Sequence, residues 1–187
     1  MTMKKLIALD GSTTKSGYAV FKIYKDNHFS LQSSGVIIPP KTKKAKATTK
    51  KEKKENRSLD MDFRMFYMRD IIFDICEHEH PDYIVVEDTY LGKDPSAYKW
   101  LCRLQGFLMG YSQVHNIDFD ISQPSHWRSA LSIPLKDGTR FYKRDELKAL
   151  SKDYCENTLF IENTTEDESE AILIGWSKLI ELGMIEK

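Results

Sequence analysis

Short apolar segments alternate with longer amphipathic segments along this chain, and their order predicts an α/β fold. Residues 4–38 contain three β-type runs separated by polar turns, and we expect them to form an antiparallel meander. The run YIVVE at 83–87 is apolar without alternation, which is typical of a strand buried on both faces. A fifth strand is predicted at 117–122, where the sequence is IDFDIS.

Apolar residues that recur three and four positions apart predict the helices between and after these strands. Pro81 ends the first helix, and Thr165 is the expected N-cap of the last. The predicted helices cover residues 60–80, about twenty residues from Pro95, a short segment around Trp127, residues 143–158 and residues 165–182. Together the elements predict a mixed five-stranded sheet that is flanked by helices on both faces.

The composition is that of an ordinary globular protein. Hydrophobic residues make up 41% and charged residues 30% of the 187 positions. A chain of this length fits one domain, so we expect a single domain over residues 1–187. No apolar run approaches the roughly 20 residues that span a membrane, and the start MTMKK has no signal-peptide pattern. The sequence therefore predicts a cytoplasmic protein without a membrane partner.

Charge is distributed unevenly along the chain, although the net charge is zero. Residues 41–54 contain eight lysines and a single acid, Glu52. Such a run is typical of a solvated, disordered loop, and its lysines attract a polyanion by releasing counterions. We therefore expect a flexible lysine-rich insertion at about 41–57 that contacts nucleic acid.

Four acidic residues occupy the ends of predicted strands and the start of the last helix. Asp10 ends the first strand and Glu87 ends the fourth. If these strands pair in parallel, they lie about 4.8 Å apart, and both carboxylates project from the edge where α/β sheets usually bind ligands. Asp167 and Glu170 are three positions apart, so they share one helix face. Docking of that face over the strand ends would complete a cluster of four carboxylates.

Carboxylates held this close repel one another, and they cannot all ionise unless cations neutralise them. Hard oxygen ligands select Mg²⁺ or Mn²⁺, and two such ions about 4 Å apart are a common apparatus for cutting phosphodiesters. Each acid taken alone has a simpler interpretation. An Asp before Gly-Ser-Thr usually forms a turn, and acids in a first helical turn usually interact with the helix dipole. The four acids together favour a metal site.

Three motifs, taken in order, resemble the RuvC-type Holliday junction resolvases, which have the RNase H-like fold. The first strand and hairpin of that family are similar to LIALDGSTTKSGYAVF. Its fourth strand, second acid and long helix are similar to DYIVVEDTYLGKDPSAYKWLCRLQG, and its closing acidic motif is similar to DESEAILIG. The resemblance covers most of the chain except the lysine-rich stretch, and it is closest to the phage-encoded branch of the family.

Position by position, the resemblance implies that Asp10, Glu87, Asp167 and Glu170 are catalytic acids that hold two Mg²⁺ ions, for which Mn²⁺ can substitute. Glu170 departs from the family pattern, which has Asp at this position. One ion would lower the pKa of an attacking water, and the other would steady the leaving 3′ oxygen. Cleavage of this kind leaves a 5′ phosphate.

The resemblance also assigns basic and aromatic residues to the DNA. Lys143 falls where a catalytic basic residue stabilises the transition state, and Arg128 falls at a second basic position. Tyr90 falls where an aromatic lies beside the scissile strand, and stacking on an unpaired base contributes about 1–3 kcal/mol. From composition alone, we expect Trp127 to pack into the core and Arg128 to face outward. The expected DNA-binding residues are Tyr90, Lys93, Arg128, Lys143, Lys50, Lys51, Lys53 and Lys54.

The implied function is a metal-dependent endonuclease that resolves four-way junctions or other branched DNA by paired symmetric nicks. Two cuts on opposing strands require two sites, which a C2 homodimer supplies. The resemblance places the helix that carries Trp100, Leu104 and Leu108 at the dimer interface. It further implies a role in recombination, repair or debranching in a bacterial or phage-infected cell.

Two alternatives stay open on the sequence. A nuclease of the same fold could cut flaps and branched DNA with broader specificity. Residues 10–14, DGSTT, also resemble the phosphate-binding hairpin of the actin-like and sugar kinase superfamily. Members of that superfamily need two such domains and a second glycine-rich loop to enclose ATP, whereas 187 residues supply one domain without that loop.

Overall fold

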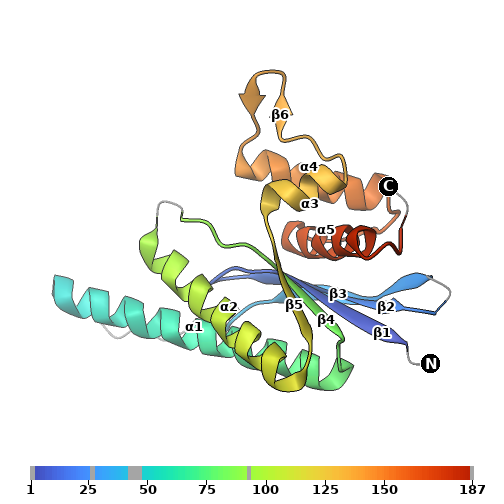
Figure 1. Ribbon diagram of the computed structural model, residues 1–187. Coiled ribbons are helices and arrows are strands. Elements are labelled where there is room, and N and C mark those ends of the chain that lie inside the picture. Colours follow the sequence, from blue (N-terminus) through green and yellow to red (C-terminus); the bar gives the residue numbers. More distant parts are fainter. Residues whose placement is uncertain (1–2, 26–27, 42–47, 92–93, 186–187) are drawn as a thin grey trace.

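The computed structural model describes residues 3–25, 28–41, 48–91 and 94–185. Five strands form a central sheet in the order β3-β2-β1-β4-β5 (Figure 1). Their bounds are β1 (Lys4–Asp10), β2 (Ser16–Ile23), β3 (Phe29–Ile37), β4 (Tyr83–Glu87) and β5 (Asp118–Ser122). The first three strands are antiparallel and β4 runs parallel to β1, which confirms both the predicted meander and the predicted parallel pairing.

Helices cover both faces of the sheet, as the sequence predicts. α1 and α2 pack on one face, α3 and α5 pack on the other, and α4 packs against α5 (Figure 1). The helices are α1 (Lys50–Glu79), α2 (Pro95–His115), α3 (Pro124–Ala130), α4 (Arg144–Asn157) and α5 (Glu166–Glu181). A small hairpin of β6 (Lys136–Asp137) and β7 (Arg140–Phe141) projects between α3 and α4, where the sequence predicts a loop. None of the described helices is long and apolar enough to cross a membrane.

Strand β1 separates two hydrophobic cores because its side chains alternate between the faces of the sheet. Leu6 and Ala8 belong to the core under α5, whereas Ile7 and Leu9 belong to the core under α1 and α2. Trp127 of α3 is fully buried in the first of these cores, which confirms its predicted position. This double burial fixes β1, and therefore the acid at its end, in the middle of the molecule.

Helix α1 begins ten residues before the predicted start at residue 60, and this corrects the expected flexible insertion. Residues 50–57 form its first two turns, while residues 42–47 lie outside the described part of the chain. Thr49 caps the helix: its hydroxyl accepts from the Glu52 amide at 3.2 Å, and the Glu52 carboxylate accepts from the Thr49 amide at 3.0 Å. This capping box pairs amides at the helix start, and the lysines that follow are good helix formers.

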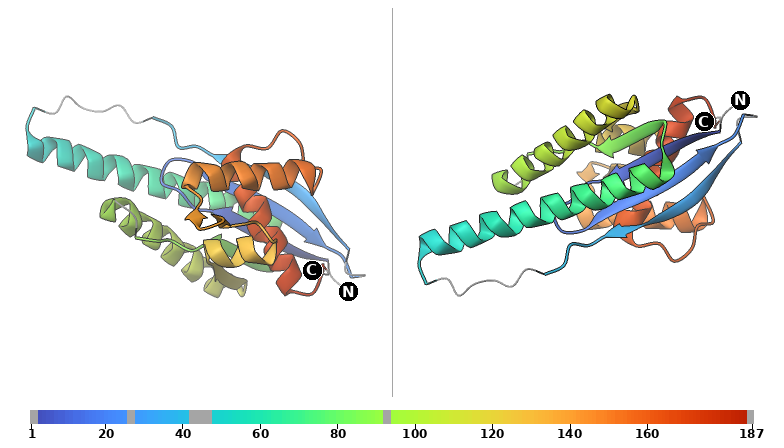
Figure 2. Two further views of the ribbon diagram at one scale, coloured as in Figure 1. Left: turned by 90° about the horizontal axis from the view of Figure 1, so that it is seen from above. Right: turned by 90° about the horizontal axis from the view of Figure 1, so that it is seen from below.

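The N-terminal half of α1 projects beyond the sheet. Its thirty residues rise about 45 Å, whereas the five residues of β4 rise about 16 Å. Because α1 turns back directly into β4, its projecting end lies on the side where β1 and β4 have their carboxyl ends (Figures 1 and 2). Arg57 of this projection donates a 2.5 Å hydrogen bond to Asp94, the N-cap of α2. The lysine-rich first turns of α1 therefore overhang one edge of the sheet.

Candidate active site

The four predicted acids meet at the carboxyl ends of β1 and β4. Asp10 ends β1, Glu87 ends β4, and the parallel register places the two strand ends side by side. Asp167 and Glu170 come from the first turns of α5, whose N-cap is Thr165, as predicted. Carboxylate oxygens of Asp10, Asp167 and Glu170 all lie within 4.8 Å of one another, and the three residues are buried. The structure therefore brings together the acids that the sequence singles out.

Two glycines allow α5 to approach the sheet this closely. A Cβ atom on Gly17 of β2 would lie 1.9 Å from the backbone carbonyl oxygen of Asp167. A Cβ atom on Gly175 would lie 2.3 Å from the ring of Phe21. Gly17 therefore sets the distance between β2 and the first turn of α5, and with it the position of Asp167.

Glu87 lies at the edge of the cluster and faces α3. The side chain of Gln105 donates to the Glu87 backbone carbonyl at 2.9 Å, which fixes the end of β4 against α2. The indole N–H of Trp127 donates to the Glu87 carboxylate at 3.1 Å, and Nη1 of Arg128 lies 3.9 Å from the same oxygen. The carboxylate is thus oriented by a buried tryptophan from another element.

Arg128 is buried among the acids, so the prediction that it faces outward is wrong. Only 6% of the residue is exposed, its guanidinium pairs with Glu170, and it lies 4.0 Å from the centroid of the Trp127 ring. Its Nε atom has no hydrogen-bond partner within the described ranges. The short helix α3 packs against α5, and a buried carboxylate such as Glu170 needs a cationic partner.

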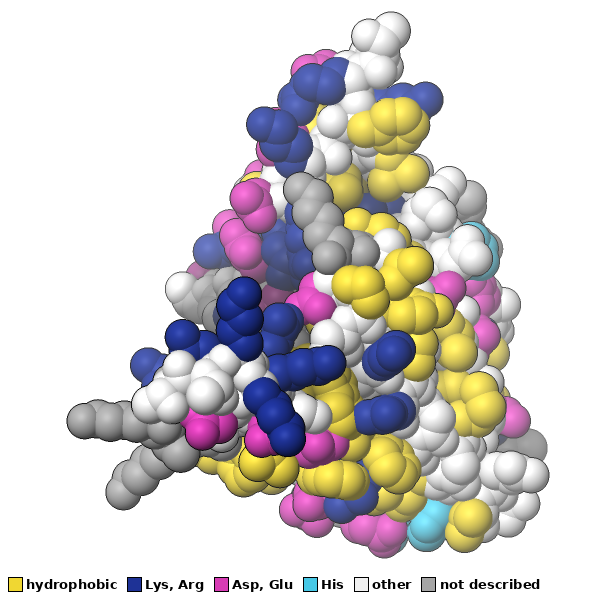
Figure 3. All heavy atoms as spheres, turned by 90° about the vertical axis from the view of Figure 1, so that its left-hand side faces the viewer, with side chains coloured by type: hydrophobic (Ala, Val, Ile, Leu, Met, Phe, Trp, Pro, Cys, Tyr) yellow, Lys and Arg dark blue, Asp and Glu magenta, His cyan; other side chains and the backbone are white. Residues whose placement is uncertain are grey.

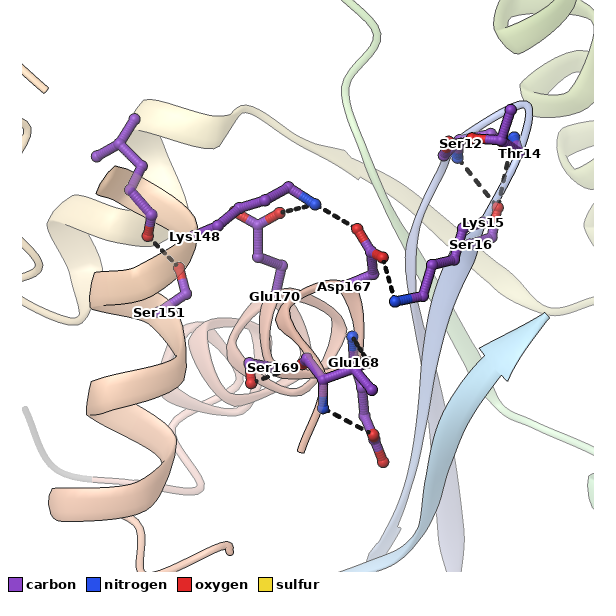
Figure 4. A network of polar contacts seen from close by, with 12 residues as sticks. Ser12, Thr14, Lys15, Ser16, Lys148, Ser151, Asp167, Glu168, Ser169 and Glu170 are labelled. Carbon is purple, nitrogen blue, oxygen red and sulfur yellow. Dashed lines mark hydrogen bonds and ion pairs between the residues drawn. The ribbon is translucent and has the colours of Figure 1, made fainter. Parts of the chain in front are cut away.

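Lys148 of α4 is a second cation at the cluster, and sequence reasoning missed it. Its ammonium pairs with Asp167 and lies 3.6 Å from Oε2 of Glu170 (Figure 4). A signal was present in the sequence, because Lys148 shares one helix face with Ser151 and Cys155, three and seven positions on. These three are the buried residues of α4. A lysine on the buried face of an amphipathic helix indicates an acidic partner.

The predicted basic residue Lys143 lies elsewhere. It is the exposed N-cap of α4, and its backbone amide donates to the Glu146 carboxylate at 2.7 Å. No ion pair joins its side chain to the four acids within the part of the chain that the structure describes. Tyr90 is 78% exposed in the loop after β4. Lys93 lies outside the described residues.

Lys15, in the turn between β1 and β2, is the third cation and was also missed. Its Nζ atom lies 3.0 Å from Oδ2 of Asp167 (Figure 4). The turn is held by the Ser16 hydroxyl, which accepts from the Ser12 amide and donates to the Ser12 carbonyl, both at 3.0 Å. The backbone that carries Lys15 is therefore fixed, while the side chain reaches across to α5.

Burial and mutual repulsion give the acids different proton affinities. Burial raises the pKa of Asp10 well above its ordinary value, and the charges of Glu87 and Glu170 raise it further. Burial, followed by the charge of Glu170, also raises the pKa of Glu87. Burial acts on Asp167 in the same direction, but hydrogen bonds from the two lysines hold its pKa below the ordinary value. The protein's own cations therefore stabilise the ionised form of Asp167 the most and that of Asp10 the least.

The donor set fits a hard divalent cation. Asp10, Asp167 and Glu170 offer buried carboxylate oxygens at mutual distances that one ion can bridge, and Mg²⁺ and Mn²⁺ prefer such oxygens. Glu87 lies beside them as a fourth donor. Within the described residues, three cationic side chains pair with the four carboxylates, so the fully ionised cluster carries a negative charge that a metal ion would neutralise.

The raised pKa of Asp10 predicts how the stability of the metal-free protein changes with pH. Below the pKa of an unfolded Asp, about 4, the group is neutral in both states and carries no penalty. As pH rises toward the higher folded pKa, only the unfolded state ionises freely, so stability falls. We expect the melting temperature of Asp10→Asn in EDTA to exceed that of the unsubstituted protein by a margin that grows from pH 4.5 to pH 8. A margin independent of pH in scanning calorimetry would contradict this assignment.

Comparison with known proteins supports the fold. No protein-family model and no curated protein matches the sequence. The fold is similar to Thermus thermophilus RuvC solved in complex with a Holliday junction substrate, with a TM-score of 0.63 and 11% identity over 96% of both chains. It is similar to Thermus thermophilus RuvC in a second structure, with a TM-score of 0.61 and 13% identity over 96% of this chain and 97% of that chain.

A third similar structure is the yeast mitochondrial Holliday junction resolvase Ydc2. Its TM-score is 0.54, with 14% identity over 97% of this chain and 81% of that chain. The similarity to all three spans nearly the whole sequence, including the elements that carry the four acids. The chain therefore has the RNase H-like α/β fold of the RuvC-type resolvases, as the resemblance of its three motifs predicts.

Proposed function

We propose that this protein is a metal-dependent endonuclease that resolves four-way or other branched DNA by paired symmetric nicks. The observation that carries the proposal is the cluster of three buried carboxylates within 4.8 Å of one another at the carboxyl ends of β1 and β4. The likeness in fold to a protein solved with a Holliday junction substrate supports the choice of substrate. The nicks are expected to leave 5′ phosphates.

In this proposal the four acids hold two Mg²⁺ ions, with Mn²⁺ as a substitute. Bound divalent cations supply Lewis acidity, which lowers the pKa of water and offsets charge on phosphate oxygens. The protein's residues orient the acids: Trp127 donates to Glu87, and Arg128 pairs with Glu170. These buried partners keep the carboxylates in place before substrate arrives, which is the pre-organisation that electrostatic catalysis needs.

The projecting end of α1 is the proposed DNA-binding surface. Figure 3 looks onto the end of the molecule from which α1 projects, and Lys and Arg side chains gather there around this helix. Four exposed lysines occupy its first two turns, where positive charge opposes the helix dipole and lowers stability. A polyanion would relieve that repulsion. The four are Lys50, Lys51, Lys53 and Lys54.

Replacing these four lysines by alanine tests the role of the α1 projection. We expect weaker binding to every DNA shape, and a salt slope that decreases by about 0.9 for each phosphate that no longer pairs with a lysine. The helix should persist, because alanine is the best helix former and the Thr49–Glu52 capping box is retained. Fluorescence anisotropy at several salt concentrations measures the slope. An unchanged slope, with circular dichroism unchanged, would show that the projection does not bind DNA.

A homodimer is the proposed assembly, because a two-fold junction needs two opposed sites. Trp100, Leu104 and Leu108 of α2 face the core and are buried, so they are not available to a partner. The outer surface of α1 and α2 instead exposes large apolar side chains beside the open glycines Gly106 and Gly110. These exposed side chains are Phe63, Phe66, Phe107, Met109 and Val114.

Phe107→Glu tests this interface. Phe107 is 38% exposed, and its ring centroid lies 6.2 Å from that of Phe66, so a charge there would be buried at a dimer contact. We expect the unsubstituted protein to have the mass of a dimer in light scattering and Phe107→Glu to have the mass of a monomer. Phe160→Glu, at an 82% exposed site in the α4–α5 loop, is the matched control and should stay dimeric. A monomer mass for the unsubstituted protein, with and without junction DNA, would refute the proposal.

Cleavage of a synthetic immobile four-way junction tests the function itself. Duplex, flap and single-stranded DNA serve as controls, each with Mg²⁺, Mn²⁺ or EDTA. Paired symmetric nicks that are confined to the junction and require metal would establish a resolvase. Equal cutting of flaps and junctions would instead indicate a nuclease with broader branched-DNA specificity. Failure to cut any DNA would overturn the proposal and direct attention to RNA and to ATP binding.

A further inference from the structure

Asp167 is held by a lysine at each of its two carboxylate oxygens. Lys148 pairs with Oδ1, and Nζ of Lys15 lies 3.0 Å from Oδ2 (Figure 4). A divalent cation that uses Asp167 would bind directly to one of these oxygens. An ammonium group on the same oxygen would repel it, because like charges a few ångströms apart destabilise each other strongly when partly buried. One lysine must therefore move when Asp167 becomes a metal ligand.

Lys15 is the lysine that can move at lower cost. Its side chain is 37% exposed, and its one ion pair within the described ranges is to Asp167. The side chain of Lys148 is 11% exposed, and its ammonium is buried between two acids, pairing with Asp167 and lying 3.6 Å from Oε2 of Glu170. Unpairing a partly exposed ion pair costs little, whereas unpairing a buried one leaves an uncompensated charge.

The position of Lys15 determines where its ammonium goes after release. The turn that carries it follows Asp10 directly, at the edge of the sheet where a DNA strand must lie for its phosphate to reach the acids. Hydrogen bonds between Ser12 and Ser16 fix the backbone of the turn, so only the side chain has to rotate. A DNA phosphate bound at this edge would lie close to the released ammonium group of Lys15.

We propose that Lys15 is an exchangeable counter-cation, which neutralises Asp167 in the metal-free protein and passes to a DNA phosphate when metal binds Asp167. The inference rests on the proposed nuclease function. Its consequence is reciprocal: metal frees Lys15 for DNA, and DNA that captures Lys15 frees Asp167 for metal. Metal and junction DNA therefore bind cooperatively, and part of the coupling depends on this one side chain.

Lys15→Met tests the exchange, because it removes the charge and keeps a long unbranched side chain. The matched control is Lys25→Met, an equal change of charge beyond the opposite end of β2. Isothermal titration with Mg²⁺ in the absence of DNA measures metal affinity. Anisotropy with a labelled four-way junction, in Ca²⁺ and in EDTA, measures how strongly a divalent cation promotes DNA binding.

We expect Lys15→Met to bind Mg²⁺ about 5-fold more tightly than the unsubstituted protein, and to lose a similar factor of coupling between divalent cation and junction. Lys15→Arg should restore the coupling, and Lys25→Met should match the unsubstituted protein in both measurements. Unchanged or weaker Mg²⁺ binding by Lys15→Met, or an unchanged coupling factor, would overturn the inference. If the unsubstituted protein nicks the junction, these results test the role of Lys15 alone. If the unsubstituted protein neither binds nor nicks the junction, the proposed function itself is overturned.

Discussion

Asp10→Asn is expected to abolish junction cleavage and to leave the fold and junction binding intact. The substitution removes a buried ligand from the three-carboxylate cluster, and a lost metal interaction of several kcal/mol corresponds to a rate loss of at least about 10³-fold. It also removes a negative charge that repels the phosphate, so DNA affinity should stay equal or rise. Burial and the neighbouring acids disfavour the ionised Asp10, so the variant should be no less stable than the unsubstituted protein in EDTA.

The measurement pairs single-turnover cleavage with junction anisotropy on the same preparations. Asp118→Asn is the matched control, since Asp118 is exposed at the start of β5, the opposite edge of the sheet from the acids. That variant should cleave and bind as the unsubstituted protein does. Full cleavage by Asp10→Asn would show that Asp10 is not a metal ligand. Loss of DNA binding together with cleavage would show that Asp10 has a structural role instead.

Gly17→Ala is expected to impair both folding stability and cleavage. The added methyl group would lie 1.9 Å from the backbone carbonyl oxygen of Asp167, so β2 and the start of α5 must separate. Overpacking of this kind costs about 1–3 kcal/mol. Because Asp167 moves with the helix, cleavage should fall by about 10²-fold, the effect of a misplacement near 1 Å.

Gly11→Ala is the control for stability, because a Cβ atom there meets nothing within 4 Å. That change should be neutral or stabilise by about 0.4–1 kcal/mol, through the reduced entropy of the unfolded chain. Urea denaturation gives both free energies of unfolding. Equal stability of Gly17→Ala and Gly11→Ala would show that α5 tolerates displacement from β2. The close contact between Gly17 and α5 would then not contribute to stability.

The three cations that pair with the acids explain how the site forms without metal. Four carboxylates would repel one another if they were alone, yet Arg128, Lys148 and Lys15 each pair with at least one of them. The metal ion therefore completes a cluster that the chain has largely neutralised. Asp10 forms no ion pair with any of the three cations within the described ranges, so burial and the charges of Glu87 and Glu170 raise its pKa with little opposition.

Local patterns in the sequence determined the sheet, the helices and the four acids. Apolar runs marked β1 and β4 as strands, β4 as one buried on both faces, and each run ends in its acid. The spacing of Asp167 and Glu170 placed both on one face of α5. The early start of α1 was also readable, because Thr49 and Glu52 have the spacing of a capping box, although the run of lysines indicated disorder.

Tertiary structure alone decided which cations serve these acids. Lys148 contacts Asp167 because α4 packs against α5 with its buried face, and Lys15 reaches the same carboxylate from a turn more than 150 positions earlier. Arg128 points inward because α3 packs against α5, where Glu170 needs a partner. Contacts of this kind depend on how whole elements pack rather than on local spacing. The sequence by itself therefore determined the negative half of the site, and the packing of helices against the sheet determined the positive half.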